Sequence, residues 1–302
     1  SRMDYLSGLI YNHGYVAAVE KMAGIEVPPR AEYIRVICAE LNRICSHLLW
    51  FGTYLLDLGG ITPFLYAFDD REHIMDTLDR VTGSRLTYNY CRFGGVAKDV
   101  DAEFVRAARA FIQRLRSRFD DYHTLVTKNV IFIHRTRGVG VINRDAALRF
   151  GCTGPVLRAA GVPYDIRRAE PYSVYPLLEF DIPTGTTGDV MDRYMVRMQE
   201  MEQSLRILEQ ALDGLPEGPF KGRAPRKVRP PKGDYYFAVE SARGALGYYI
   251  VSDGTSYPYR IKMRVPSFGN LQVLTEVLSG TLVADTVAIL GSVDIVVPEV
   301  DR

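Results

Sequence analysis

Residues 28–60 read PPRAEYIRVICAELNRICSHLLWFGTYLLDLGG and decide the fold. In this stretch apolar side chains recur three or four positions apart, the spacing of one face of an α-helix. They are Ile34, Ile37, Leu41, Ile44, Leu48, Phe51, Leu55 and Leu58. Two prolines precede the pattern and two glycines follow it, as they do at helix ends. The sequence therefore predicts one long core helix.

Helical spacing also covers about residues 5–22, 63–82, 102–127 and 189–212. The last of these segments carries a stripe of methionines, which we interpret as core packing and not as a cofactor site. Together with the long helix these segments predict a helical bundle, and the fold class is α+β, mainly helical.

Strands are predicted at residues 235–240, 247–252 and 260–265, which are rich in Tyr, Val and Phe. Residues 138–183 mix short apolar runs with glycines and prolines, and predict a small irregular α+β insertion. Residues 221–232 hold six basic residues, three prolines and no acid. This segment is either an exposed linker or a docking strip for an acidic partner.

Composition excludes several classes of function. The chain has 302 residues, 47% of them apolar, and a formal charge of +1, which gives no overall field for nucleic acid or anionic membrane. Its four cysteines form no C-x-x-C pair, so neither a zinc site, an iron–sulfur site nor a disulfide framework is predicted. The longest uncharged apolar stretch, around residues 48–56, is far shorter than the roughly 20 residues of a membrane helix.

The N-terminus has no signal-peptide pattern and no methionine at position 1. We therefore expect a cytosolic chain, truncated at its N-terminus, that meets a membrane only through partners. Phosphate loops, dinucleotide fingerprints, H-E-x-x-H pairs and G-x-S-x-G elbows are missing from the sequence. The chain is not predicted to be an enzyme by itself.

Asp57 lies in the last turn of the long helix, where the helix dipole disfavours an anion by roughly 0.3–1 kcal/mol. With Asn42, Ser46 and Thr53 it forms a polar row at helical spacing. The row is either a solvated face or the polar lining of a buried cleft.

The opening Arg2-x-Asp4-Tyr5 places a phenol beside an acid and a base at a helix start. A helix-capping acid next to a packed tyrosine explains this arrangement, and so does a tyrosine that donates a hydrogen bond to a carbonyl ligand. The charged C-terminal residues 299–302 have no interpretation by themselves.

The order of short motifs along the whole chain resembles the D-type subunit, the large peripheral-arm subunit of the NADH:quinone oxidoreductases known as respiratory complex I. The matching runs are residues 2–7 (RMDYLS), 18–21 (AVEK), 28–36 (PPRAEYIRV), 46–49 (SHLL), 56–59 (LDLG), 62–64 (TPF), 71–72 (RE), 94–96 (GGV), 138–140 (GVG), 157–158 (LR), 164–168 (YDIRR), 251–254 (VSDG), 282–285 (LVAD) and 294–302 (DIVVPEVDR).

The resemblance implies the fold of the large subunit of nickel–iron hydrogenases, as one domain over residues 1–302 that lacks an N-terminal α/β hairpin region. Hydrogenases hold their metal with two cysteine pairs, which are soft ligands. This chain carries Ile295, Val296 and Val297 in place of one cysteine run. No metal bound by this chain is therefore expected.

The resemblance also implies a quinone site. Tyr5 matches the tyrosine that hydrogen-bonds the quinone headgroup and supplies a proton. Asp57 matches the carboxylate that orients a quinone-site histidine, which belongs to the missing hairpin. Further quinone-binding positions are implied at Leu49, Thr53, Asp294, Val296 and Glu299.

Near the partner's iron–sulfur cluster the resemblance places Arg2 and Thr87. Many members of the family carry a histidine at the position of Thr87, so a proton-coupled histidine is not expected here, and the cluster potential should depend less on pH. Pro298 replaces the usual glycine of the tail, which removes a backbone donor.

The implied function is a quinone-binding subunit of a proton-pumping translocase, on the cytoplasmic face of the bacterial plasma membrane. Its implied partners are the small B-type subunit with a [4Fe-4S] cluster, the C-type subunit, the ferredoxin-like I-type subunit and the H-type and A-type membrane subunits, with NAD bound elsewhere and no nucleic acid. Two alternatives stay open: a ferredoxin- or deazaflavin-linked quinone oxidoreductase, and a structural scaffold without quinone chemistry.

Overall fold

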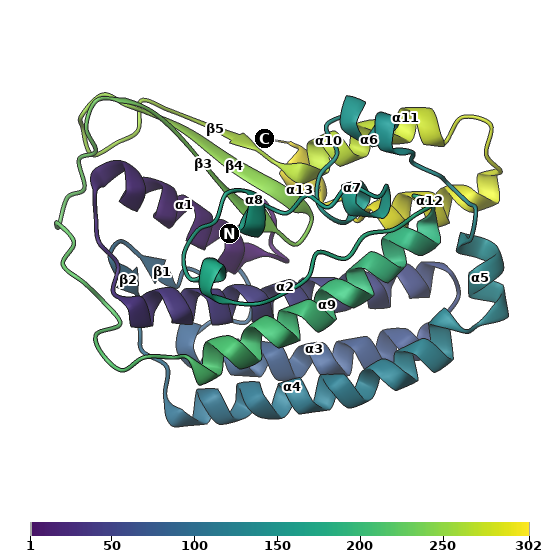
Figure 1. Cartoon of the computed structure of the whole chain (residues 1–302), viewed down its shortest axis with the longest axis horizontal. Helices are drawn as coiled ribbons and strands as arrows, with labels where there is room; N and C mark the ends of the chain where they lie inside the picture. Colours follow the sequence, from purple (N-terminus) through teal and green to yellow (C-terminus); the bar gives the residue numbers. More distant parts are fainter. Residues whose placement is uncertain (1, 302) are drawn as a thin grey trace.

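A computed structural model describes residues 2–301, and four long helices that lie side by side form its base (Figure 1). They are α2 (Pro29–Asp57), α3 (Ile61–Thr82), α4 (Ala102–Tyr122), which continues as a π-helix (His123–Thr127), and α9 (Val190–Asp213). The predicted long helix is confirmed as α2. It begins with Pro29, where the missing N–H would have no partner anyway, and ends before the two glycines.

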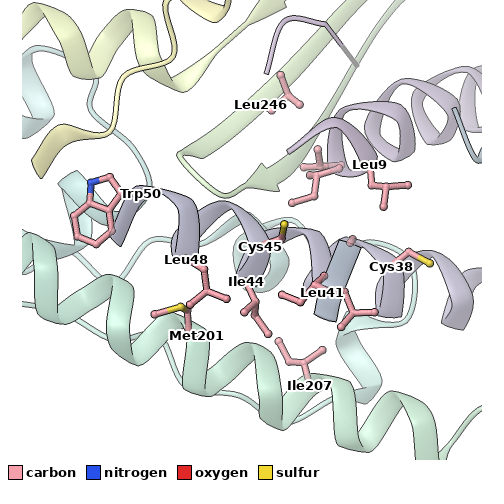
Figure 2. Packing of buried hydrophobic residues seen from close by; sticks show 14 of the residues in the cluster. Leu9, Cys38, Leu41, Ile44, Cys45, Leu48, Trp50, Met201, Ile207 and Leu246 are labelled. Carbon is pink, nitrogen blue, oxygen red and sulfur yellow. The ribbon is translucent and has the colours of Figure 1, made fainter. Parts of the chain in front are cut away.

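The core lies between α2 and α9. Leu41, Ile44 and Leu48 of α2 are completely buried, and Figure 2 shows Met201 and Ile207 of α9 pointing toward α2. Burying each aliphatic side chain of this size stabilises the fold by about 1.5–3 kcal/mol. The methionine stripe is therefore core packing, as predicted.

A three-stranded antiparallel sheet covers α1 (Gly8–Ala23), with the strand order β3 (Gly233–Ser241), β4 (Gly244–Ser252) and β5 (Arg260–Arg264). All three predicted strands are confirmed. Gly14 allows this close approach, because a Cβ atom there would lie 2.8 Å from side-chain atoms of Val239 and Tyr248. A second, two-stranded sheet, β1 (Cys91–Arg92) with β2 (Gly95–Val96), is too short for the sequence pattern to predict.

Residues 138–183 differ from the predicted α+β insertion, because none of these described residues lies in a strand. Glycines with positive φ, including Gly151, Gly154 and Gly161, turn the backbone out of the extended conformation that a strand requires. Short helices follow α5 (Val130–Thr136) instead: α6 (Arg144–Arg149), α7 (Pro155–Ala159), α8 (Ile166–Ala169) and a 3₁₀ turn (Tyr175–Leu177).

The C-terminal part folds back over the end of α2. Its elements are α10 (Pro266–Gln272), α11 (Leu274–Val277), a 3₁₀ turn (Val283–Asp285), α12 (Thr286–Val293) and α13 (Val297–Val300). Within residues 2–301, no helix is both long and apolar enough to cross a membrane. The predicted α+β, mainly helical class is confirmed.

Candidate functional site

A cavity of about 760 Å³ lies where the end of α2 meets α12 and the C-terminal tail. This volume is within the range of small-molecule sites. The residues that line it are Trp50, Thr53, Tyr54, Asp57, Leu271, Val287, Leu290, Gly291, Asp294, Ile295, Val297 and Val300. The structure thus brings three of the predicted site residues together, namely Thr53, Asp57 and Asp294.

Aromatic side chains of α2 hold α12 in place as one wall of this cavity. Trp50 Nε1 donates a hydrogen bond of 2.7 Å to the carbonyl oxygen of Gly291. Trp50 also stacks on Tyr54, and the guanidinium of Arg197 lies 4.4 Å from the indole. A Cβ atom at Gly291 would lie only 2.6 Å from Tyr54, so glycine is what allows α12 to approach α2.

Asp294 is the polar residue of the cavity with a buried, unused acceptor. It ends α12 in a left-handed conformation (φ 61°), which aspartate tolerates better than most residues. Its Oδ1 atom lies 3.3 Å from Nη2 of Arg243. Its Oδ2 atom is buried and has no hydrogen-bond partner among residues 2–301. A buried carboxylate oxygen without a hydrogen-bond partner can accept a hydrogen bond from a ligand or a partner chain.

Arg243 connects the cavity with the N-terminal segment. Its Nη1 atom lies 2.7 Å from Oδ2 of Asp4 and 3.2 Å from the hydroxyls of Ser7 and Ser46. Burial by itself would lower the pKa of Arg243, but the charges of Asp294 and Asp4 raise it above its ordinary value. The guanidinium therefore stays charged and ties Asp4, the neighbour of Tyr5, to the cavity.

Tyr5 and Asp57 both have side chains without an internal role. Tyr5 is 40% exposed, and its phenol makes no hydrogen bond within the described chain. It does not line the cavity itself. Asp57 is exposed at the cavity edge and forms no ion pair with any residue between 2 and 301. Both groups can therefore bind something outside the chain.

The rest of the polar row on α2 faces inward. Asn42 is buried, accepts a hydrogen bond from the Leu9 amide and donates one to the Leu6 carbonyl. Ser46 is buried beside Arg243. Of the two interpretations of this row, the solvated face is wrong for these residues.

Leu49, Val296 and Glu299 do not line the cavity in this structure. Leu49 is half-buried and accepts a hydrogen bond of 2.9 Å from the Thr53 hydroxyl through its carbonyl. Val296 is buried. Glu299 is fully buried, and its carboxylate accepts hydrogen bonds from the hydroxyls of Tyr11 and Ser267.

Glu299 also has an unusual acidity. Burial, and then the charge of Asp4, raise the pKa of its carboxyl to about 7, against the opposing effect of Arg243. Burial, and then the charge of Glu299, raise the pKa of Tyr11 well above its ordinary value. Both shifts favour the protonated forms, so this pair holds its protons more tightly than the free side chains would.

Arg2 and Thr87 are exposed and so accessible to a partner. Thr87 has φ 53°, which is unusual for a β-branched residue. Pro298 lies in the first turn of α13, where its missing N–H would have no partner in the helix, so this departure from the family pattern breaks no helical hydrogen bond.

Sequence reasoning missed Arg243, Trp50 and Tyr54. Arg243 stands in the two-residue turn between β3 and β4, where an arginine is usually solvent-exposed, so no local signal distinguished it. Trp50 and Tyr54 lie beside the apolar stripe of α2, and only the position of α12 gives them a role. Among residues 2–301, no group of three or more His, Cys, Asp or Glu side chains is arranged to hold a metal ion.

The chain is thus a mainly helical α+β protein whose C-terminal tail folds over a cavity at the end of its longest helix. The profile of the family described as respiratory-chain NADH dehydrogenase, 49 Kd subunit, matches residues 57–230 and 225–302. The chain belongs to this family.

Similar proteins include the D-type subunit of the NADH-quinone oxidoreductase of Syntrophobacter fumaroxidans, which is 68% identical over 100% of this chain and 81% of the relative. The D-type subunit of Desulfotalea psychrophila is 54% identical over 100% of this chain and 82% of its own length. The D 2 subunit of Opitutus terrae is 54% identical over 100% of this chain and 76% of its own.

Proposed function

We propose that this chain binds quinone in the cavity beside Asp294 and, in a proton-pumping complex with a partner subunit that carries a [4Fe-4S] cluster, reduces it to quinol. The observation that carries this proposal is the buried, unpartnered Oδ2 atom of Asp294 in a cavity large enough for a quinone headgroup. The names of the relatives, which are subunits of NADH-quinone oxidoreductases, support quinone as the ligand.

The lining suits a quinone, which is an apolar ring with two polar oxygens. Leu271, Leu290 and Ile295 supply apolar walls. Asp294 supplies an acceptor for a quinol hydroxyl, and Thr53 lies on the α2 side of the same cavity. This combination of many apolar and few polar groups is typical of small-molecule sites.

Reduction of quinone to quinol takes up two electrons and two protons. The electrons arrive one at a time from the partner's cluster, and Tyr5 donates one proton from its exposed phenol. Asp57 holds the histidine that the family resemblance implies, so that the second proton is delivered at the cavity. Leu49, Val296 and Glu299 act indirectly, because each lies next in sequence to a residue that lines the cavity.

The exposed surface around the cavity suits the proposed partners. Of the apolar residues that line the cavity, Val297 is 74% exposed, Val287 45% and Leu290 44%, and apolar side chains exposed together usually mark an interface. We assign this rim to the H-type and A-type membrane subunits, and the exposed Arg2 and Thr87 to the B-type subunit. The C-type and I-type subunits bind elsewhere. The chain is then a peripheral subunit on the cytoplasmic face of the membrane.

The test is the variant pair Tyr5→Phe and Asp294→Asn in the assembled complex. We expect each to lower quinone reduction at least about tenfold, because Tyr5→Phe removes the proposed proton donor and Asp294→Asn the proposed acceptor. Electron transfer from NADH to a hydrophilic artificial acceptor should be unchanged. The matched control is Tyr66→Phe, on the exposed face of α3. Unchanged quinone reduction in both variants would favour a scaffold without quinone chemistry.

A further inference from the structure

The near-neutral total charge conceals a strongly basic region. Residues 221–264 hold ten Lys and Arg against three Asp and Glu, whereas the rest of the chain holds 27 against 33. One of the three acids, Glu240, is buried. We give the name basic face to seven exposed cations of this region: Arg223, Arg226, Lys227, Arg229, Lys232, Arg260 and Lys262.

The cations of the basic face are not used inside the molecule. None of them forms an ion pair with another described residue. By contrast, the exposed Arg109 and Arg116 of α4 each pair with a carboxylate. The basic face therefore keeps its charge available for an outside group.

Two segments distant in sequence form this face side by side. The Ser252 hydroxyl donates a hydrogen bond of 3.0 Å to the carbonyl of Pro230, which joins the linker to the end of β4. Beside this contact lies an apolar recess of about 90 Å³, between Val228 of the linker and Tyr257 and Pro258 of the β4–β5 loop. That volume suits one aliphatic side chain and is well below the size of a small-molecule site.

Exposed tyrosines border the recess. Tyr257 is 79% exposed and Tyr259 75%, and tyrosine together with arginine is enriched in protein interfaces. Strand β5 is an edge strand, with its outer side unpaired among the described residues. Figure 1 shows the linker and the β4–β5 loop at the end of the molecule away from α12, so this surface is separate from the cavity.

We infer that the basic face is the docking surface for an acidic, extended segment of a neighbouring polypeptide in the complex. Acidic side chains of the segment pair with Lys227, Arg229 and Lys232, and one apolar side chain enters the recess. Complementary charge orients such a contact, and the inserted side chain gives it specificity. This inference does not depend on quinone chemistry, because it rests on family membership and on a surface remote from the cavity.

A polypeptide fits this surface better than a membrane or a nucleic acid. A lipid surface is broad and recruits basic residues without a recess for a single side chain. Nucleic acid would be held by charge and by stacking on aromatic rings along a groove. The basic face combines charge with a small recess and an open strand edge, which are features that recognise a polypeptide.

The experiment is carbodiimide cross-linking of the assembled complex, which joins lysine amines to carboxylates in direct contact, followed by mass spectrometry. We expect Lys227, Lys232 and Lys262 to be linked to a stretch rich in Asp and Glu on another polypeptide of the complex. Lys128, an exposed lysine outside the face, serves as the control and should give no such link. If the three lysines remain unlinked and react with an acetylating reagent as readily as Lys128, the inference is wrong.

A variant pair supplies a second readout. The double variant Lys227→Glu, Arg229→Glu should lower retention of the polypeptide identified by cross-linking about tenfold. The complex is purified without cross-linker in moderate salt, and the new glutamates repel the acidic side chains of that polypeptide. Lys227→Arg with Arg229→Lys, which keeps both charges, should retain it fully. Equal retention in both pairs would overturn the inference. So would binding of the chain to phosphatidylglycerol vesicles that the charge reversal abolishes, since this would assign the face to a membrane. Neither readout uses quinone reduction, so failure here leaves the quinone proposal untouched.

Discussion

The guanidinium of Arg243 lies between two buried carboxylates, with Nη2 3.3 Å from Oδ1 of Asp294 and Nη1 2.7 Å from Oδ2 of Asp4. One side chain thereby neutralises an acid at the cavity and an acid next to Tyr5. The two acids lie near opposite ends of the sequence, and no helix or strand connects them. The position of Asp294 therefore depends on a residue in a hairpin turn.

Replacing Arg243 with Met should destabilise the fold by about 3–5 kcal/mol, because it leaves two buried carboxylates without a cation. Thermal unfolding of the purified chain measures this loss. Arg260→Met, on the exposed strand β5, is the control and should change stability by less than about 0.5 kcal/mol. Equal effects of the two substitutions would show that the bridge contributes nothing.

Glu299 should make stability depend on pH. The pKa of its carboxyl is about 7 in the fold and 4.5 by ordinary value, so the folded state binds the proton more tightly than the unfolded state. The resulting stabilisation is complete below about pH 4.5 and is lost as pH rises through 7. Its size is on the order of 1–3 kcal/mol.

The check is the thermal midpoint of the native chain and of Glu299→Gln between about pH 5 and 7.5, the window in which the carboxyl ionises. The native midpoint should fall more steeply with pH than that of the variant, which cannot ionise. If the thermal midpoints of the native chain and the variant change equally with pH, Glu299 does not bind a proton more tightly in the folded state.

Gly140 should be needed to seat α12 against the core. Its φ is 57°, and a Cβ atom there would lie 2.6 Å from Cγ1 of the buried Ile289. Gly140→Ala should cost about 1–2 kcal/mol in backbone strain and a further 1–3 kcal/mol in overpacking. Gly138→Ala is the matched control, since it has φ 72° but open space around a Cβ atom. Urea unfolding of both variants separates strain from packing, and equal losses would refute the packing effect.

Trp50 should report quinone binding, because it is the single tryptophan of the sequence and lines the cavity. A short-chain benzoquinol, whose hydroxyl can donate a hydrogen bond to Asp294, should quench its fluorescence with a saturable dependence on concentration. Asp294→Asn should weaken that binding about fivefold, the effect of one altered hydrogen bond worth about 1 kcal/mol. Quenching that rises linearly without saturation, or that Asp294→Asn leaves unchanged, would place quinone elsewhere.

Thr87 should determine how the potential of the partner's cluster responds to pH. Because threonine does not titrate near neutrality, the potential in the assembled complex should vary little between about pH 6 and 8. Thr87→His introduces a group with an ordinary pKa of about 6.5 and should make the cluster potential depend more steeply on pH. Redox titration at several pH values tests this. Thr87→Asn is the control, because asparagine tolerates positive φ and does not titrate. A steep slope in the native complex would contradict the prediction.

Local patterns accounted for the elements that repeat regularly. The three- and four-residue spacing of apolar side chains predicted α2 and α9, and the runs of Tyr, Val and Phe predicted β3 to β5, since one buried face of a helix or strand requires these periods. The order of motifs along the chain also pointed to the family, because a long ordered series rarely recurs by chance.

The failures lie where distant segments decide the outcome. Residues 138–183 contain apolar runs of strand length, yet they pack as short helices because glycines with positive φ turn the backbone. Glu299 remains a prediction for the quinone site, and no sequence pattern indicated that its carboxylate accepts hydrogen bonds from Tyr11 and Ser267.

By itself the sequence determined the helices, the strands, the family and the candidate residues Thr53, Asp57 and Asp294, because periodicity and motifs are local properties of the chain. Only the tertiary structure decided that these three share a cavity, that Arg243 joins Asp294 to Asp4, and that the linker lies beside the β4–β5 loop. Each of these arrangements depends on which segments meet in space, and burial and charge then act between residues that the sequence keeps far apart.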